Sequence, residues 1–196
     1  MKPHSEACER NRDPILEVLR QWLLQPGLVL EIGAGTGQHA VYFAEHLPHL
    51  TWQPTDRDEN LAGIRAWVAE AKLTNLLDPI ELDVAVGAPP VSRADYVFTA
   101  NTAHIMGWQE VENMFAMVDQ VLATGGLFCL YGPVNRNGEF TSESNRAFDK
   151  MLRSRDPRMG IRDDRALFAL AEECGLALRA DTQMPANNRM LIWEKG

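Results

Sequence analysis

The sequence predicts one α/β domain over residues 1–196, with a mostly parallel sheet and helices on both of its faces. Strand-like and helix-like segments alternate along the chain, which is typical of parallel sheets built from strand–helix–strand units. A glycine-rich turn at residues 31–37 stands between the first such strand and the helix that follows. The last two strand-like segments have no helical pattern between them, so they can pair as an antiparallel hairpin at the sheet edge. A sheet that is parallel throughout is the alternative.

Each predicted strand is a short apolar or β-branched run that ends at turn residues. The first, LVLEI, leads directly into the glycine-rich turn, and another, GLFCLY, is entered through Gly125 and Gly126. In chain order, the predicted strands cover residues 28–32, 51–55, 79–82, 95–100, 126–131, 177–184 and 190–194.

Each predicted helix repeats apolar side chains at helical spacing. The helix after the glycine-rich turn, for example, places Phe43 and Leu47 on one face. In chain order, the predicted helices cover residues 13–23, 36–47, 59–72, 109–122, 142–153 and 163–174.

The composition limits the classes of partner. A net charge of −8 disfavours nucleic acid, which binds to clustered Lys and Arg, so a small or cationic molecule fits better. No run approaches the ~20 apolar residues that cross a bilayer, and the polar N-terminus lacks the apolar run of a secretion signal. Cys8, Cys129 and Cys174 lack metal-ligand spacing. We expect a cytoplasmic protein with a small-molecule partner, no nucleic acid, no membrane and no metal; the oligomeric state is not indicated.

The glycine-rich turn predicts a ligand site. Gly33 and Gly35 would let the backbone turn sharply and approach a ligand, while Gly37 would allow close packing of the next helix. The spacing is G-x-G-x-G, whereas folds that bind dinucleotides normally have G-x-G-x-x-G. An ionised Glu31 would repel a pyrophosphate and attract an ammonium group, directly or through water. This favours S-adenosylmethionine over NAD; a glycine turn without a ligand is the alternative.

Polar residues after the next three strands extend the predicted cofactor site. Asp56 lies where ribose-binding folds place an acid that accepts bonds from both sugar hydroxyls, although it could instead cap a helix, a role that suits Asp58 better. Asp83 could accept from the adenine amino group or be a turn residue. Asn101 ends the fourth strand at the predicted switch point of the sheet, where it could meet cofactor or substrate. The N-terminal segment could fold over the cofactor so that Arg10 or Arg12 meets the methionine carboxylate, or it could have a capping or surface role.

S-adenosylmethionine is a methyl donor, and methyl transfer from it is an in-line displacement. An enzyme that uses it would mainly need to align the reactants, and a general base would be optional. His104 could take a proton from a hydroxyl or amine, or simply be a structural hydrogen-bonding residue. Further candidates for the substrate side lie in the loop after the fifth strand and in the final hairpin, where Asn and Gly are also ordinary turn formers. These candidates are Tyr131, Asn135, Asn137, Glu139 and Asn187.

With these residues in place, the chain closely resembles class I S-adenosylmethionine-dependent methyltransferases, specifically the domain-of-unknown-function 938 group related to methyltransferase-like protein 26. The resemblance is carried by ACERNRDPIL, LEIGAGTGQHAVYFA, TANTAHIMGW, YGPVNRNGEFTSESNRAFD, DPRMGIRD and MPANN. It implies a Rossmann-like sheet of seven strands in the order 3-2-1-4-5-7-6 with the last strand antiparallel.

The resemblance also implies cofactor contacts at Glu31, Gly33, Gly35, Asp56 and Asp83. Ala103 and Met106 depart from the group's pattern, in which we expect a bulkier apolar and a small polar residue, so the pocket shape is expected to differ. The group itself indicates no substrate.

Three functional hypotheses remain open. The first is an S-adenosylmethionine-dependent methyltransferase that acts on an unidentified small molecule. The second is a module that binds S-adenosylmethionine or S-adenosylhomocysteine without turnover, because a fold does not fix a function. The third, a nicotinamide-dependent oxidoreductase, is disfavoured by the glycine spacing and by Glu31.

Overall fold

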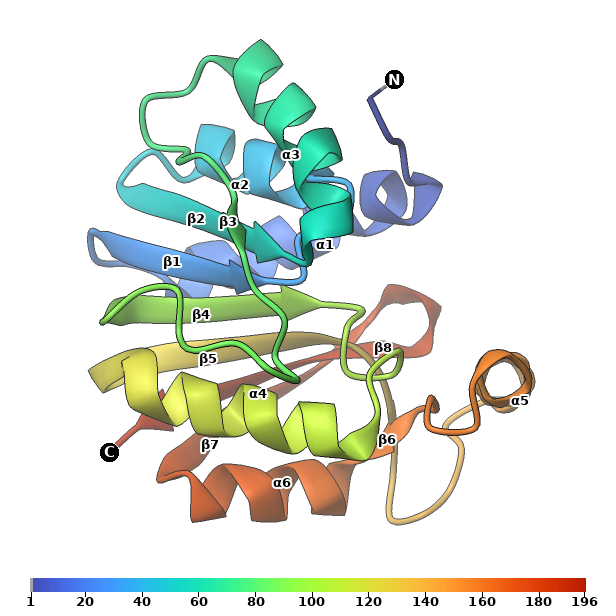
Figure 1. Ribbon diagram of the computed structural model, residues 1–196. Helices are drawn as coiled ribbons and strands as arrows, with labels where there is room; N and C mark the ends of the chain where they lie inside the picture. The colour runs from blue at the N-terminus through green and yellow to red at the C-terminus, as the bar shows by residue number, and fades with distance from the viewer. Residues whose placement is uncertain (1) are drawn as a thin grey trace.

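The computed structural model describes residues 2–196, so residue 1 of the predicted domain lies outside the described part (Figure 1). The helices are α1 (Glu6–Trp22), α2 (Gln38–His46), α3 (Asp58–Ala71), α4 (Trp108–Val121), α5 (Glu143–Arg155), α6 (Asp164–Glu173) and the 3-10 helix η1 (Pro185–Asn187). The strands are β1 (Gly27–Ile32), β2 (Leu50–Asp56), β3 (Ile80–Glu81), β4 (Ala94–Ala100), β5 (Leu122–Asn135), β6 (Arg162–Asp163), β7 (Leu176–Met184) and β8 (Asn188–Lys195).

The strands form one sheet in the order β3-β2-β1-β4-β5-β8-β7, with β6 paired to β5 away from this path. Strands β1 to β5 pair in parallel, whereas β8 is antiparallel to both β5 and β7. Counting β7 and β8 as the sixth and seventh strands, the order 3-2-1-4-5-7-6 is confirmed. The alternative of a wholly parallel sheet is wrong. The predicted count of seven is corrected to eight, because the two-residue β6 is too short to give a sequence pattern.

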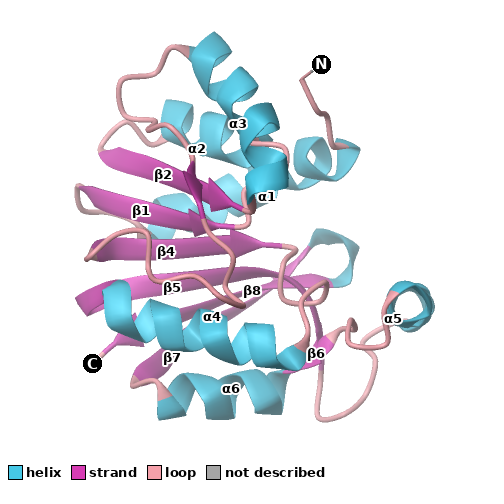
Figure 2. Ribbon diagram, in the orientation of Figure 1, coloured by secondary structure: helices cyan, strands magenta, loops and turns pink. Residues whose placement is uncertain are grey.

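Helices cover both faces of the sheet, as predicted (Figure 2). Successive residues of a strand point to opposite faces, so each strand serves two cores. In β1, Val29 packs in the core under α1 and α2, whereas Leu30 packs in the core under α4 and α6. The sheet is therefore buried on both sides, which explains why its strands are continuous apolar runs.

Fully buried aromatic rings occupy the centre of the core under α1 and α2. The Phe98 ring of β4 lies edge-on to Phe43 of α2, with centroids 5.4 Å apart. Trp52 of β2 lies 5.8 Å from Phe98 and 5.5 Å from Phe43. These three rings join α2 to two strands that flank β1 and so fix the helix that follows the glycine-rich turn.

The first helix begins earlier than the sequence predicts. We expected it to begin at residue 13, where the amphipathic pattern begins, and Pro14 is a residue type that suits the first turn of a helix. Instead α1 starts at Glu6, its N-cap is Ser5, and Pro14 lies inside the helix. Arg10 is therefore a helical residue rather than part of a preceding segment. No helix in residues 2–196 has the length and apolar character needed to cross a membrane.

Replacing Phe98 with alanine should lower the free energy of unfolding by about 3 to 5 kcal/mol, because it leaves a cavity among rings that are already close-packed. Urea denaturation monitored by circular dichroism measures this loss. Leu178→Ala is the matched control, because Leu178 is 42% exposed on β7 and its truncation should change stability by no more than about 0.5 kcal/mol. Equal losses in the two variants would contradict the assignment of the central core.

Candidate functional site

A large cavity opens at the ends of the central parallel strands. Its volume is about 1310 Å³, which exceeds the roughly 300 to 1000 Å³ of a typical small-molecule site. One end, which we call the glycine-turn end, is lined by the turn after β1 and by residues that follow β2 and β3. The other, which we call the α5 end, is lined by the loop after β4, by α5 and its following loop, and by the β7–β8 turn. The cavity has room for two small molecules.

The three glycines of the turn have different surroundings. Gly33 and Ala34 both donate their N–H groups to the carbonyl of Thr55, and a Cβ on Gly33 would collide with the methyl group of Thr102. A Cβ on Gly37 would lie 3.1 Å from Cα of Ile64 in α3. A Cβ on Gly35, in contrast, has nothing within 4 Å. Gly33 and Gly37 therefore permit close packing within the protein, and Gly35 is the glycine whose Cβ direction is open.

Asp56 ties this turn to the end of β2. One carboxylate oxygen accepts from the Gly35 N–H at 2.6 Å, and the other accepts from the Arg57 N–H at 2.8 Å and the Asn60 amide at 2.7 Å. Asp56 lines the cavity and is not the N-cap of α3, which is Arg57; Asp58 is the first helical residue. A carboxylate has about four acceptor positions, so bidentate binding of a diol would displace at least one of these bonds.

Glu31 lies beneath the turn rather than on the cavity wall. Its side chain is 1% exposed and accepts a hydrogen bond from the indole of Trp52 at 2.8 Å. Burial raises the pKa of Glu31 to about 8. The expectation of an ionised carboxylate at Glu31 is therefore corrected, because burial favours the protonated form at neutral pH.

Two further predicted cofactor residues line the cavity. Asp83, which follows β3, accepts the Ala85 N–H at 2.8 Å and so forms a turn, the alternative considered for it. Asn101, which follows β4, has a left-handed φ of 60° and donates its N–H to the carbonyl of Tyr131. That conformation is uncommon outside glycine and asparagine, and it turns the chain sharply away from the sheet. The cavity therefore collects polar residues from strand ends that are distant in sequence.

His104 lies in the loop after β4 and lines the cavity, with 6% of its surface exposed. Burial lowers its pKa to about 4, and the charge of Arg162 acts in the same direction. Within residues 2–196, its ring contacts Phe148 edge-on at 5.2 Å but has no hydrogen-bond partner. An imidazole that is uncharged at neutral pH can accept a hydrogen bond from a ligand.

Arg162 of β6 holds the His104 loop in place. Its guanidinium donates to the carbonyls of Ala103 at 2.9 Å, Arg158 at 3.1 Å and Met106. In addition, the Gly160 N–H donates to the carbonyl of His104 at 2.9 Å. The loop is thus fixed through its backbone by the segment that follows α5. Of the two residues that depart from the expected pattern, Met106 lines the cavity and Ala103 is buried in the core.

The predicted substrate residues divide into two groups. Tyr131 and Asn187 line the cavity. Asn135, Asn137 and Glu139 do not, although we expected their loop to overhang it. Asn137 and Glu139 belong to a tight turn closed by backbone bonds between Arg136 and Glu139, and the Asn135 amide donates to a backbone carbonyl at 3.4 Å.

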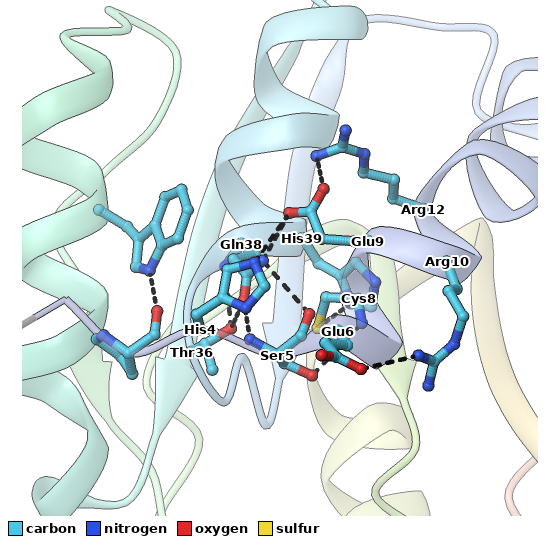
Figure 3. A network of polar contacts seen from close by, with 12 residues as sticks. His4, Ser5, Glu6, Cys8, Glu9, Arg10, Arg12, Thr36, Gln38 and His39 are labelled. Atoms are coloured by element: carbon cyan, nitrogen blue, oxygen red, sulfur yellow. Dashed lines mark hydrogen bonds and ion pairs between the residues drawn. The ribbon is translucent and has the colours of Figure 1, made fainter.

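The N-terminal segment is attached to the turn through Gln38 (Figure 3). The Gln38 side chain accepts from the Ser5 N–H at 2.6 Å and from the Thr36 hydroxyl at 3.0 Å, and it donates to Glu9 at 2.7 Å. Arg10 lines the cavity and pairs with the exposed Glu6 at 3.3 Å. Helix α1 therefore contributes a wall to the cavity.

Several cavity residues were missed by sequence reasoning. They are the neighbouring Cys8 and His39 near the turn, and Asn145, Phe148 and Met159 at the α5 end. All of them lie in segments that carry the family resemblance. Nothing in a single sequence indicated that the α5 helix would face the strand ends, because its exposed and buried faces follow an ordinary amphipathic pattern.

Comparison with solved structures relates this architecture to methyltransferases. An O-methyltransferase family protein from Burkholderia thailandensis matches with a TM-score of 0.84 and 15% identity over 97% of this chain and 58% of its own. The S-adenosylmethionine-dependent methyltransferase SibL matches with a TM-score of 0.81 and 18% identity over 96% of this chain and 55% of the SibL chain. Human N-acetylserotonin methyltransferase in complex with SAM matches with a TM-score of 0.77 and 16% identity over 97% of this chain and 53% of the human chain. The chain thus spans little more than half the length of these proteins and shares their fold.

The family model described as "Protein of unknown function (DUF938)" matches residues 2–195, nearly the whole chain. The protein therefore belongs to the DUF938 family, and it has the fold of class I methyltransferases.

Proposed function

We propose that this protein is an S-adenosylmethionine-dependent methyltransferase that acts on a small-molecule acceptor. The observation that carries the proposal is a single cavity that joins the glycine-turn end to the α5 end, where His104 lies. A protein that bound the cofactor without turnover would need only the glycine-turn end of the cavity. S-adenosylmethionine, when bound, supplies an electrophilic methyl group.

The residues of the glycine-turn end fit this cofactor. The open Cβ direction at Gly35 leaves space for close approach of a ligand to the backbone. Asp56 offers carboxylate acceptors to ribose hydroxyls, and Asp83 offers them to the adenine amino group, while the buried Leu82 and Val84 provide apolar surface beside the base. Arg10, which also lines the cavity, would supply the positive charge that binds the methionine carboxylate. Glu31 provides a negative charge for the ammonium group once it releases its proton.

The function as a whole is tested by titrating the protein with S-adenosylmethionine, S-adenosylhomocysteine and NAD in a calorimeter. We expect micromolar binding of the two sulfur compounds and no binding of NAD. A transfer assay with labelled methyl groups and a pool of small metabolites then tests turnover. Binding of NAD alone, or of none of the three, would exclude the proposal.

Asp56→Ala should weaken S-adenosylhomocysteine binding by about 2 to 3 kcal/mol, the scale of a lost charge-assisted hydrogen bond in a partly buried site. Calorimetric titration measures the change, and Asp58→Ala is the control at the start of the same helix. Asp56 also holds the turn, so adenosine and 2′,3′-dideoxyadenosine are compared as well. If the substitution weakens the binding of both nucleosides equally, Asp56 supports the turn and does not bind the ribose hydroxyls.

Binding of the cofactor product should release a proton from Glu31. The pKa of Glu31 is raised to about 8 in the unliganded protein, so an arriving ammonium group lowers this pKa and drives deprotonation. Affinity should therefore rise with pH toward about 8 and fall above it, because the α-amino group of the ligand then loses its own proton. Titrations at pH 6.5 in buffers of different ionisation enthalpy count the protons, because the ligand's α-amino group is already charged there. Glu31→Gln should abolish the release; release that persists in this variant would place its source elsewhere.

His104→Gln should lower kcat for an acceptor found in the labelled screen by roughly 10²- to 10⁴-fold, the usual contribution of a general base. Affinity for S-adenosylhomocysteine should not change. Because the pKa of His104 is lowered to about 4, the wild-type rate should show no inflection from this residue between pH 5.5 and 8. His49→Gln, an exposed histidine outside the cavity, is the control. An unchanged kcat would leave His104 without a role in proton transfer.

A further inference from the structure

The α5 end of the cavity is walled by segments that follow β5. Helix α5 contributes Asn145 and Phe148, its following loop contributes Met159, and the β7–β8 turn contributes Asn187. Figure 1 shows α5 set apart from the helices that cover the sheet faces. The helix is therefore available to enclose a ligand rather than to cover the sheet.

Charged side chains at this end balance one another within the protein. Arg158 donates to Asp156 through two nitrogens, the closer pair being 2.7 Å apart. Glu110 accepts the Gly107 N–H and so closes the first turn of α4, and its charge acts on the guanidinium groups of Arg158 and Arg162. The two carboxylates and two guanidinium groups leave no excess charge, so a charged ligand would lose its hydration here without an excess of opposite charge to replace it, which is unfavourable. The α5 end therefore favours an uncharged molecule.

Asn145 presents an acceptor whose identity is fixed by its neighbours. Its Nδ2 donates to the backbone carbonyl of Asn187 at 3.1 Å and to the Thr141 hydroxyl at 2.9 Å. A carbonyl can only accept, so the amide cannot be flipped and Oδ1 is the free atom. The side chain is 5% exposed, lines the cavity, and its Oδ1 has no hydrogen-bond partner within residues 2–196. A ligand that fills this end must supply a donor or leave a buried acceptor unsatisfied.

Aromatic and thioether side chains complete the surface. The Phe148 ring meets the His104 ring edge-on, and Tyr131, Met106 and Met159 also line the cavity. Flat apolar walls of this kind suit a planar ring, and methionine adapts to its outline. Among residues 2–196 the His104 ring nitrogens have no hydrogen-bond partner, so this side chain offers a second acceptor beside the aromatic surface.

We propose that the methyl acceptor is an uncharged phenol that carries a second O–H or N–H donor, with the reacting hydroxyl at His104 and the second donor bound by Asn145 Oδ1. This assignment rests on the proposed function. In the reaction, a bond forms between the phenol oxygen and the methyl carbon while the carbon–sulfur bond breaks. The sulfur keeps the electron pair as S-adenosylhomocysteine, and the hydroxyl proton passes to His104. Asn145 selects the acceptor and takes no part in the chemistry.

Four probes that share one phenol ring test the assignment at pH 7. They are 4-hydroxybenzyl alcohol, its methyl ether at the benzylic oxygen, 4-hydroxybenzoate and tyramine. Binding is measured by titration into protein already saturated with S-adenosylhomocysteine. The alcohol should bind at least about tenfold more tightly than each of the other three probes. The ether lacks the second donor, and 4-hydroxybenzoate and tyramine are charged at pH 7. This comparison uses the wild-type protein, so it does not depend on how a variant folds.

Asn145→Leu should reduce the alcohol-to-ether ratio to about one without changing the affinity for S-adenosylhomocysteine. Arg146→Ala, an exposed neighbour on α5 that pairs with Glu143, should keep the wild-type ratio. Equal or tighter binding of either charged probe or of the ether, or binding of none of the four to the loaded protein, would overturn the assignment. Failure of S-adenosylhomocysteine itself to bind is seen before any probe is added, and it would instead refute the proposed function.

Discussion

The hydrogen bond from the Gly35 N–H to the Asp56 carboxylate is the interaction on which the site depends. It links the turn that leaves β1 to the end of β2, and the same carboxylate holds the start of α3 through Arg57 and Asn60. The two neighbouring N–H groups of the turn bond to Thr55 of the same strand. The turn is therefore shaped by β2 rather than by its own sequence alone. A ligand that competes for Asp56 would act on the strand, the turn and the helix together.

Burial sets the protonation of three titratable groups in and around the cavity. Glu31 has its pKa raised to about 8, and His39 and His104 have theirs lowered to about 4. All three shifts favour the uncharged form, as expected when desolvation is the largest cause. Glu31, His39 and His104 are thus uncharged at neutral pH in the unliganded protein, and each would become charged when a ligand supplies a counter-charge or a proton.

Much of the fold could be predicted from the sequence, because buried parallel strands are apolar runs and their turns are marked by glycines. The start of α1 could not, because Pro14 resembles a helix beginning and only tertiary contacts of Ser5 and Gln38 show that the helix starts earlier. The same limit applies at the site. Residues at strand ends, such as Asp56 and Asn101, could be placed in the cavity from topology. Glu31 was placed near the turn, but its protonation depends on burial against Trp52, which a sequence does not reveal.

The two ends of the cavity are held together in different ways. The glycine-turn end stands on strand termini, whose positions follow from the sheet. The α5 end consists of loops and a detached helix, and side-chain bonds to backbone carbonyls join them: Arg162 to the His104 loop, and Asn145 to the β7–β8 turn. Each of these bonds uses a donor from one segment and a carbonyl from another, so the segments are ordered only as a group. Changes at the α5 end can therefore reshape that end of the cavity, while the sheet and the glycine-turn end remain as they are.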